Sequence, residues 1–199
     1  MHGLWMSGLE TLTLRRRLAR AGFEPRLFRY PSTRASLADA AGALAGELRG
    51  FGSGPAHLIG HSLGGLVILR TFESEGRLPD GRVVLLGSPV RGSRAARAVA
   101  AWSIGPRLLG PLAASELTRA REPAWRWPQQ LGVIAGSRPV GLGRMFAGLP
   151  APNDGTVAVD ETDVAGVRDA AVFDVSHLGM LLSADVAAAV ARFLDSGRF

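Results

Sequence analysis

The strongest chemical signal in the chain is the segment 60–64, Gly-His-Ser-Leu-Gly, which has the pattern G-x-S-x-G. The apolar residues 56–59 before it have the composition of a buried strand, and the apolar-rich residues 65–72 after it can start a helix. A serine on a sharp strand-to-helix turn faces the substrate, and the flanking glycines let the backbone crowd together there. The pattern predicts a nucleophile at Ser62, although chance could also place three such residues in a chain with 26 glycines.

A serine hydroxyl is a good nucleophile only when a base takes its proton, and the chain offers four histidines. His61 is adjacent to Ser62, so the two side chains diverge. His57 lies a strand's length away, and His2 belongs to a different loop. Elimination leaves His177, which directly follows the last predicted strand. Because the carboxyl ends of parallel strands share one edge of the sheet, we expect Ser62 and His177 to meet there.

The base needs an acid that holds its tautomer and stabilises the imidazolium. Asp174 precedes His177 within the same predicted strand and should point elsewhere. Asp154 lies in a Pro-Asn-Asp-Gly turn after the preceding strand, so it should reach the same edge as His177. Asp154 is therefore the first candidate and Asp160 the second. Because Asn-Asp-Gly is also what a plain turn uses, the spacing alone leaves the choice open.

An oxyanion hole needs two fixed N–H donors. One is expected from the backbone of Leu63, the residue after the nucleophile. The other should come from the N-terminal segment His-Gly-Leu-Trp at residues 2–5, and the N–H of Leu4 is the candidate. The alternative is that residues 2–5 are only a frayed start of the chain.

The elements that must position these residues follow from alternating strand-like and helix-like runs, which predict an α/β protein with a mostly parallel sheet. Helices are expected over residues 9–21, 36–49, 64–75 and 184–195. Strands are expected over residues 23–30, 56–60, 82–86, 131–135 and 170–175. Residues 91–128 break the alternation, because helical pieces there are mixed with prolines and tryptophans. A Gly/Pro-rich loop is expected over about 136–156.

Composition narrows the class of protein. The chain has 199 residues, of which 47% are hydrophobic, so it can fold as one domain over residues 1–199 with a sizeable core. The absence of cysteine excludes disulfides, thiolate zinc sites and a cysteine nucleophile. No apolar run is long enough for a transmembrane helix, and the start lacks the layout of a secretory signal. We therefore expect a soluble, cytoplasmic protein.

The net charge of +6 comes from 23 basic residues, all of them arginine. Such a charge can attract nucleic acid or an anionic membrane, and a nucleic-acid binder is the function that charge alone would suggest. The arginines are scattered, however, and no aromatic ladder lies between them. Codon bias in a GC-rich genome is the simpler explanation, so we expect no specific nucleic-acid partner. Without a lysine for a P-loop, an H-E-x-x-H or a G-x-G-x-x-G, we expect no cofactor and no metal.

Taken together, these motifs resemble those of the α/β-hydrolases, close to small bacterial lipases and esterases and to the inositol-deacylase-like group. The matching segments are residues 2–4, 60–65, 86–89, 153–157 and 176–180. By this resemblance, the roles are nucleophile for Ser62, base for His177, acid for Asp154, and oxyanion donors for the N–H groups of Leu4 and Leu63. The resemblance also implies an α/β-hydrolase fold, with a mostly parallel sheet flanked by helices and a short helical cap at about 91–128.

The function implied by the resemblance is that of a serine hydrolase that cleaves carboxylic esters through an acyl-enzyme. Its substrate would be a small-molecule acyl ester or a lipid, and the Trp and Leu residues of 91–128 would either line an acyl pocket or simply cover the core. An acyltransferase or thioesterase on the same triad is an alternative, and so is a non-catalytic binding protein on this scaffold. The family has a hydrophobic strand before the His-Gly loop, whereas only Met1 precedes His2 here. We therefore expect an unpaired strand edge, which a partner chain could supply.

Overall fold

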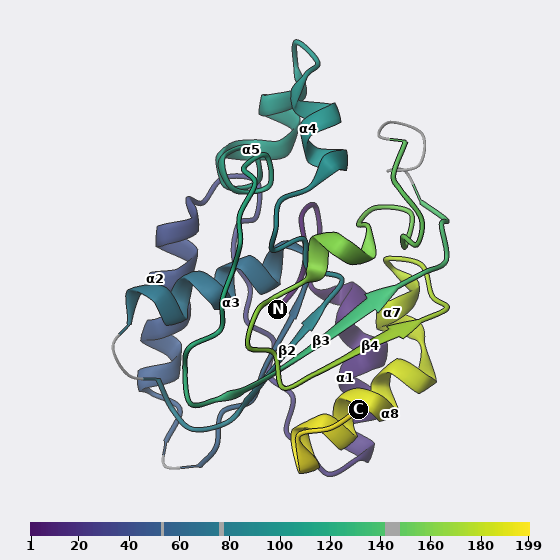
Figure 1. Cartoon of the computed structure of the whole chain (residues 1–199). Helices are drawn as coiled ribbons and strands as arrows, with labels where there is room; N and C mark the ends of the chain where they lie inside the picture. Colours follow the sequence, from purple (N-terminus) through teal and green to yellow (C-terminus); the bar gives the residue numbers. More distant parts are fainter. Residues whose placement is uncertain (53, 76–77, 142–147) are drawn as a thin grey trace.

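A computed structural model of the chain shows a four-stranded sheet with helices on both faces (Figure 1). It describes residues 1–52, 54–75, 78–141 and 148–199. All neighbouring strands are parallel, and their order across the sheet follows the sequence. The strands are β1 (Leu58–His61), β2 (Arg82–Leu86), β3 (Gln130–Gly136) and β4 (Asp169–Phe173). The predicted fold class, an α/β protein with a parallel sheet flanked by helices, is confirmed.

The central strands are continuous apolar runs, as expected for strands covered on both faces. Residues 83–86 of β2 and 131–136 of β3 are buried throughout. The register pairs Leu58 with Val83, and Val83 in turn with Leu131. This register brings the carboxyl ends of the strands to one edge of the sheet, where the predicted site residues follow.

Helices cover the two faces in separate groups (Figure 1). One face carries α2 (Leu37–Arg49) and α3 (Leu63–Ser74), which pack against each other. The other face carries α1 (Leu12–Arg20), preceded by the short 3-10 helix η1 (Leu9–Thr11), and α8 (Ala184–Ser196). Each group buries its own apolar cluster against the sheet, so the core has two layers.

Local sequence explains where the longer helices begin and end. The Ser36 hydroxyl accepts the Asp39 N–H at 3.1 Å, and the Asp39 carboxylate accepts the Ser36 N–H at 3.3 Å, so a capping box starts α2. The Ser183 hydroxyl caps α8 in the same position, accepting the Val186 N–H at 3.3 Å. Gly197 ends α8 with a φ of 79°, a conformation that glycine adopts at little cost.

The predicted insertion holds α4 (Arg94–Ala100) and α5 (Gly105–Glu116), which lie together at the top of the view in Figure 1. Gly110, with a φ of 75°, kinks α5 just before Pro111. Trp125 packs edge-on against Phe72 of α3 with ring centroids 4.6 Å apart, and Trp127 packs against the same ring in a tilted arrangement with centroids 5.4 Å apart. These two tryptophans therefore cover the core.

Residues 23–30 do not form the strand that their alternating pattern predicts. A strand exists only when a neighbour accepts its hydrogen bonds, and β1, with β2 on one side, is an edge of the sheet. A cavity separates β1 from residues 23–30. These residues therefore have the alternating side-chain pattern of a strand but no neighbouring strand with which to form hydrogen bonds.

The remaining described elements are short. They are η2 (Val159–Thr162) and α7 (Gly179–Leu182). The expected Gly/Pro-rich loop at about 136–156 lies partly outside the described residues, at 142–147. Among the helices that the structure describes, none is long and apolar enough to cross a bilayer.

Candidate active site

Ser62 lies on a sharp turn between β1 and α3, as predicted. Its backbone has a φ of 54° and a ψ of −122°, a combination that costs a non-glycine residue about 1–3 kcal/mol. The turn is held by a hydrogen bond from the Ser62 N–H to the Leu86 oxygen at 2.9 Å. A Cβ on Gly60 would lie 2.7 Å from the Gly65 Cα, and a Cβ on Gly65 would lie 2.6 Å from the Ser88 Cβ. Only glycine at these two positions lets the strand, the turn and the helix approach so closely.

His177 and Asp154 are brought together at the carboxyl edge of the sheet. The Nδ1–H of His177 donates to the Asp154 carboxylate oxygen Oδ2 at 2.7 Å. The backbone N–H of His177 donates to the backbone oxygen of Asp154 at 2.9 Å. The Asp154 side chain is fully buried. Its other oxygen, Oδ1, accepts the N–H groups of Thr156 at 2.9 Å and Val157 at 2.7 Å. The Asn-Asp-Gly turn thus folds around its own carboxylate and aims it at the histidine.

This arrangement selects one tautomer of His177. Because Nδ1 carries the proton that Asp154 accepts, Nε2 holds the lone pair and can take a proton from a hydroxyl. The pair therefore has the chemistry of a general base and the group that orients it.

Asp160 and Asp174, the other two acids considered from the sequence, pair with arginines and not with His177. Asp160 forms a two-pronged ion pair with Arg94 at 2.9 and 2.8 Å, and this guanidinium lowers the pKa of the Asp160 carboxyl. Asp174 points elsewhere, as expected, and pairs with Arg138 at 2.8 Å. Both carboxylates are largely exposed, so of the acids considered, Asp154 is the one against His177.

His61, set aside above as a base, has a contact that the sequence did not predict. Its ring is buried, and Nε2–H donates to the backbone oxygen of His177 at 2.9 Å. Burial and the neighbouring His177 keep the pKa of His61 well below its ordinary value, so the ring stays neutral. Its Nδ1 has no hydrogen-bond partner among the described residues. Sequence reasoning missed this bond, because no local pattern encodes a contact between residues 116 positions apart. The signal that could have suggested it is the histidine at the variable position directly before the serine.

The loop of residues 2–5 is anchored. His2 is buried, stacks on Tyr30 with ring centroids 4.7 Å apart, and donates from Nδ1 to the Gly3 oxygen at 3.0 Å. The Tyr30 hydroxyl donates to the His2 oxygen at 3.0 Å. A Cβ on Gly3 would lie 3.0 Å from the Ser62 Cβ, so this loop runs directly beside the serine. Leu4 follows in the same loop and is half-buried.

The structure contains no grouping of three or more His, Cys, Asp or Glu side chains able to hold a metal ion, within residues 1–52, 54–75, 78–141 and 148–199.

Comparison with known proteins adds the family. A family model described as the alpha/beta hydrolase family matches residues 1–197. No curated protein matches the chain. The mature form of the Bacillus licheniformis lipase BlEst2 is similar in structure, with a TM-score of 0.75 and 17% identity, over 100% of this chain and 90% of that one.

Two further solved structures share the fold. The Legionella pneumophila phospholipase PlaB has a TM-score of 0.63 and 14% identity, and the match covers 98% of this chain and 56% of that one. The esterase RhEst1 from Rhodococcus sp. ECU1013 has a TM-score of 0.60 and 17% identity, over 98% and 89% of the two chains. At such identities the similarity concerns the fold alone.

Proposed function

Because the chain belongs to the alpha/beta hydrolase family, we propose that it is a serine hydrolase that cleaves carboxylic esters, with Ser62, His177 and Asp154 as its triad. The observation that carries the proposal is the 2.7 Å bond between His177 Nδ1 and the buried Asp154. This bond leaves the lone pair of His177 Nε2 available to accept a proton. The loop that carries His177 is also bound to the turn of the serine, because His61, the residue before Ser62, donates a hydrogen bond to the backbone oxygen of His177. The inositol-deacylase-like group remains a prediction.

In the proposed reaction, Ser62 Oγ attacks the ester carbonyl carbon while its proton passes to His177 Nε2. The carbon–oxygen bond to the alcohol then breaks, and the alcohol leaves with the proton from His177. Water attacks the resulting acyl-enzyme, again giving its proton to His177, and the acid is released as Ser62 is restored. Asp154 remains ionised and stabilises the imidazolium in both halves of the reaction.

The oxyanion of each tetrahedral intermediate would be bound by the N–H groups of Leu63 and Leu4. Leu63 is the first residue of α3, and the first N–H groups of a helix have no partner within the helix, so they are available to an anion. Leu4 follows Gly3, which is in close approach to Ser62. The positive end of the helix dipole adds to the attraction.

Labelling with a fluorophosphonate probe tests the proposal. We expect the probe to modify Ser62 in the unmodified protein and not in Ser62→Ala, with the site identified by peptide mass spectrometry. A series of p-nitrophenyl esters, assayed with a chelator present, should be hydrolysed with an optimum that defines the acyl length. An unlabelled Ser62 in folded protein, together with no hydrolysis in the ester series, would contradict the proposal and favour a non-catalytic binding protein.

A further inference from the structure

Two glycines at neighbouring strand ends leave a space beside the pair of Asp154 and His177. Gly87 directly follows β2, and Gly136 is the last residue of β3. The two strand ends are joined by a hydrogen bond from the Gly87 N–H to the Ile134 oxygen at 2.8 Å. Because neither glycine has a side chain, this space is open to side chains from elsewhere in the chain.

The methyl group of Met180 shares this space with the pair. A Cβ added to Gly87 would lie 3.0 Å from Met180 Cε. The same point lies 3.1 Å from Asp154 Oδ2 and 3.2 Å from His177 Nδ1, the two atoms of the hydrogen bond between acid and base. A Cβ added to Gly136 would lie 2.8 Å from Met180 Cε and 2.8 Å from Asp154 Cβ. The thioether methyl therefore lies next to this hydrogen bond, against both strand ends.

The turn that follows His177 holds Met180 in this place. The Ser176 backbone oxygen accepts the Met180 N–H at 3.0 Å, and the Ser176 hydroxyl accepts the Gly179 N–H at 3.2 Å. The Met180 side chain is fully buried and belongs to the apolar cluster that α1 and α8 form against the sheet. The base and Met180 are thereby carried by one hydrogen-bonded turn that packs on the core.

The hydrogen bonds of Asp154 indicate what Met180 keeps away. Its Oδ1 accepts two backbone N–H groups, whereas its Oδ2 accepts one bond from the residues that the structure describes, that of His177. A carboxylate oxygen can accept a second hydrogen bond, and a thioether has no hydrogen to donate. Water at Oδ2 would compete with His177 Nδ1, and it would weaken a bond that is stronger in dry surroundings.

We propose that Met180 is a positioning residue of the acid–base pair, because its thioether excludes water from Asp154 Oδ2 and so holds the ring of His177 in one orientation. Alanine at position 180 would leave a void with polar atoms on its wall, and such a void admits water. Leucine has a similar volume and would keep water out. The effect on catalysis rests on the proposed function, whereas the effect on the hydrogen bond does not.

Proton NMR of the His177 Nδ1–H tests the proposal, with the signal assigned by its loss in His177→Gln. We expect Met180→Ala to speed the exchange of this proton with water by roughly 10-fold or more, because water reaches the bond. It should also lower kcat by roughly 10-fold with a smaller change in KM, because the base is less well held. Met180→Leu should retain slow exchange and most of the activity.

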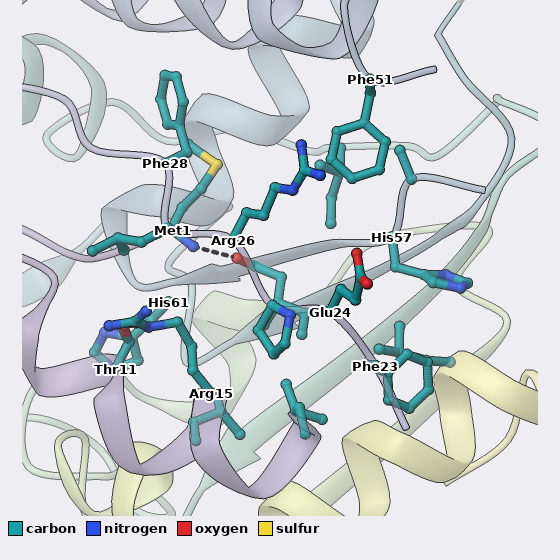
Figure 2. Close-up of a pocket in the computed structure, with 18 of the residues that line it drawn as sticks. Met1, Thr11, Arg15, Phe23, Glu24, Arg26, Phe28, Phe51, His57 and His61 are labelled. Atoms are coloured by element: carbon teal, nitrogen blue, oxygen red, sulfur yellow. Dashed lines mark hydrogen bonds between the residues drawn. The ribbon is translucent and has the colours of Figure 1, made fainter. Parts of the chain in front are cut away.

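Leu181→Ala is the matched control. Leu181 is the next residue of α7 and is equally buried, but it lines the cavity of about 540 Å³ beside β1 (Figure 2). Its truncation should lower the urea midpoint about as much as Met180→Ala does, since each removes a large buried side chain. Proton exchange at His177 and kcat should stay nearly unchanged. Met180→Gln leaves no void and brings an amide donor to Oδ2, so it should shift the Nδ1–H signal and lower kcat even if Met180→Ala is too unstable to study.

Equal proton exchange and equal kcat in Met180→Ala and Leu181→Ala would overturn the proposal, and so would an unchanged signal in Met180→Gln. Faster exchange in Met180→Ala without any probe labelling of Ser62 would support the positioning of the pair and reject the proposed function. Labelling of Ser62 together with equal exchange would support the proposed function and reject the role of Met180. The two proposals therefore fail separately.

Discussion

His61 Nε2 lies 2.9 Å from the backbone oxygen of His177, so the residue before Ser62 binds the loop that carries the proposed base. The two rings are also in contact, with centroids 4.6 Å apart. The side chain of His61 thereby links the turn of the nucleophile to the loop of the base, across the 116 positions between His61 and His177. We regard His61 as a positioning residue, because its ring is buried and its proton is already committed to this bond.

Replacing His61 with leucine should lower kcat by roughly 10- to 100-fold with a smaller change in KM, because misplacing the base affects the chemical step more than binding. His61→Gln, whose amide can donate to the same oxygen, should retain more activity. His57→Gln, at the position just before β1, is the matched control and should leave kcat nearly unchanged. Steady-state kinetics and thermal unfolding of the three variants distinguish this role from a general loss of stability. Equal kcat values for His61→Leu and the control would contradict it.

Asp154→Asn should lower kcat by roughly 10³- to 10⁴-fold while the protein remains folded. The amide can still accept the Thr156 and Val157 N–H groups, but its NH₂ would face His177 Nδ1 and favour the wrong tautomer. Asp160→Asn is the control, because it removes only an exposed ion pair with Arg94, worth at most about 1 kcal/mol. Kinetics on both variants, with circular dichroism to verify folding, decide between the two acids. A larger loss for Asp160→Asn would reverse the assignment.

A methyl group at Gly65 should destabilise the protein by about 2 kcal/mol or more, because its Cβ would overlap the Ser88 side chain. The same change at Gly42 has the opposite expected sign. That glycine is an exposed position inside α2, and a Cβ added to it would have no neighbouring atom within 4 Å, so Gly42→Ala should stabilise by about 0.5–1 kcal/mol. Urea unfolding gives the free energy of unfolding of both variants. Similar values for Gly65→Ala and Gly42→Ala would contradict the prediction.

Stability should fall as the pH drops from 8 to 5, partly because of the Met1 amino group. Burial, with a smaller contribution from Arg15, lowers the pKa of this group from 8.0 to about 5. Between these values the unfolded chain binds the proton and the folded chain does not, so folding weakens as the pH falls, by no more than about 4 kcal/mol. The lowered pKa of His61 acts in the same direction below pH 6.5.

Acetylation of the Met1 nitrogen isolates this contribution. The acetylated chain should lose less free energy of unfolding between pH 8 and pH 5 than the free chain, while the share from His61 remains. Urea titrations of both forms at the two pH values give the comparison. Identical pH dependence would show that the amino group does not titrate in a buried site.

Much of the fold could be predicted from sequence, because its strands are short apolar runs between turn residues and its helices have caps. The buried run of β2, predicted over 82–86, has those bounds in the structure. The strand predicted over residues 23–30 is not formed. An alternating side-chain pattern describes burial, whereas a strand also needs a neighbouring strand for its hydrogen bonds. For the site, turns at strand ends predicted Ser62 and His177, whereas the preference for Asp154 over Asp160 came from the family resemblance, because the spacing alone left that choice open. The bond from His61 could not be predicted, since it depends on how two loops meet in space.

The indole N–H of Trp5 donates to the Leu108 oxygen at 2.9 Å, across 103 positions of sequence. Trp5 directly follows Leu4, and Leu108 lies in α5 of the insertion. A displacement of α5 away from the sheet would therefore either break this bond or pull on the loop that holds the Leu4 amide. The insertion and the loop that carries the proposed anion-binding amide are therefore bonded directly to each other, so a change in the position of one is transmitted to the other.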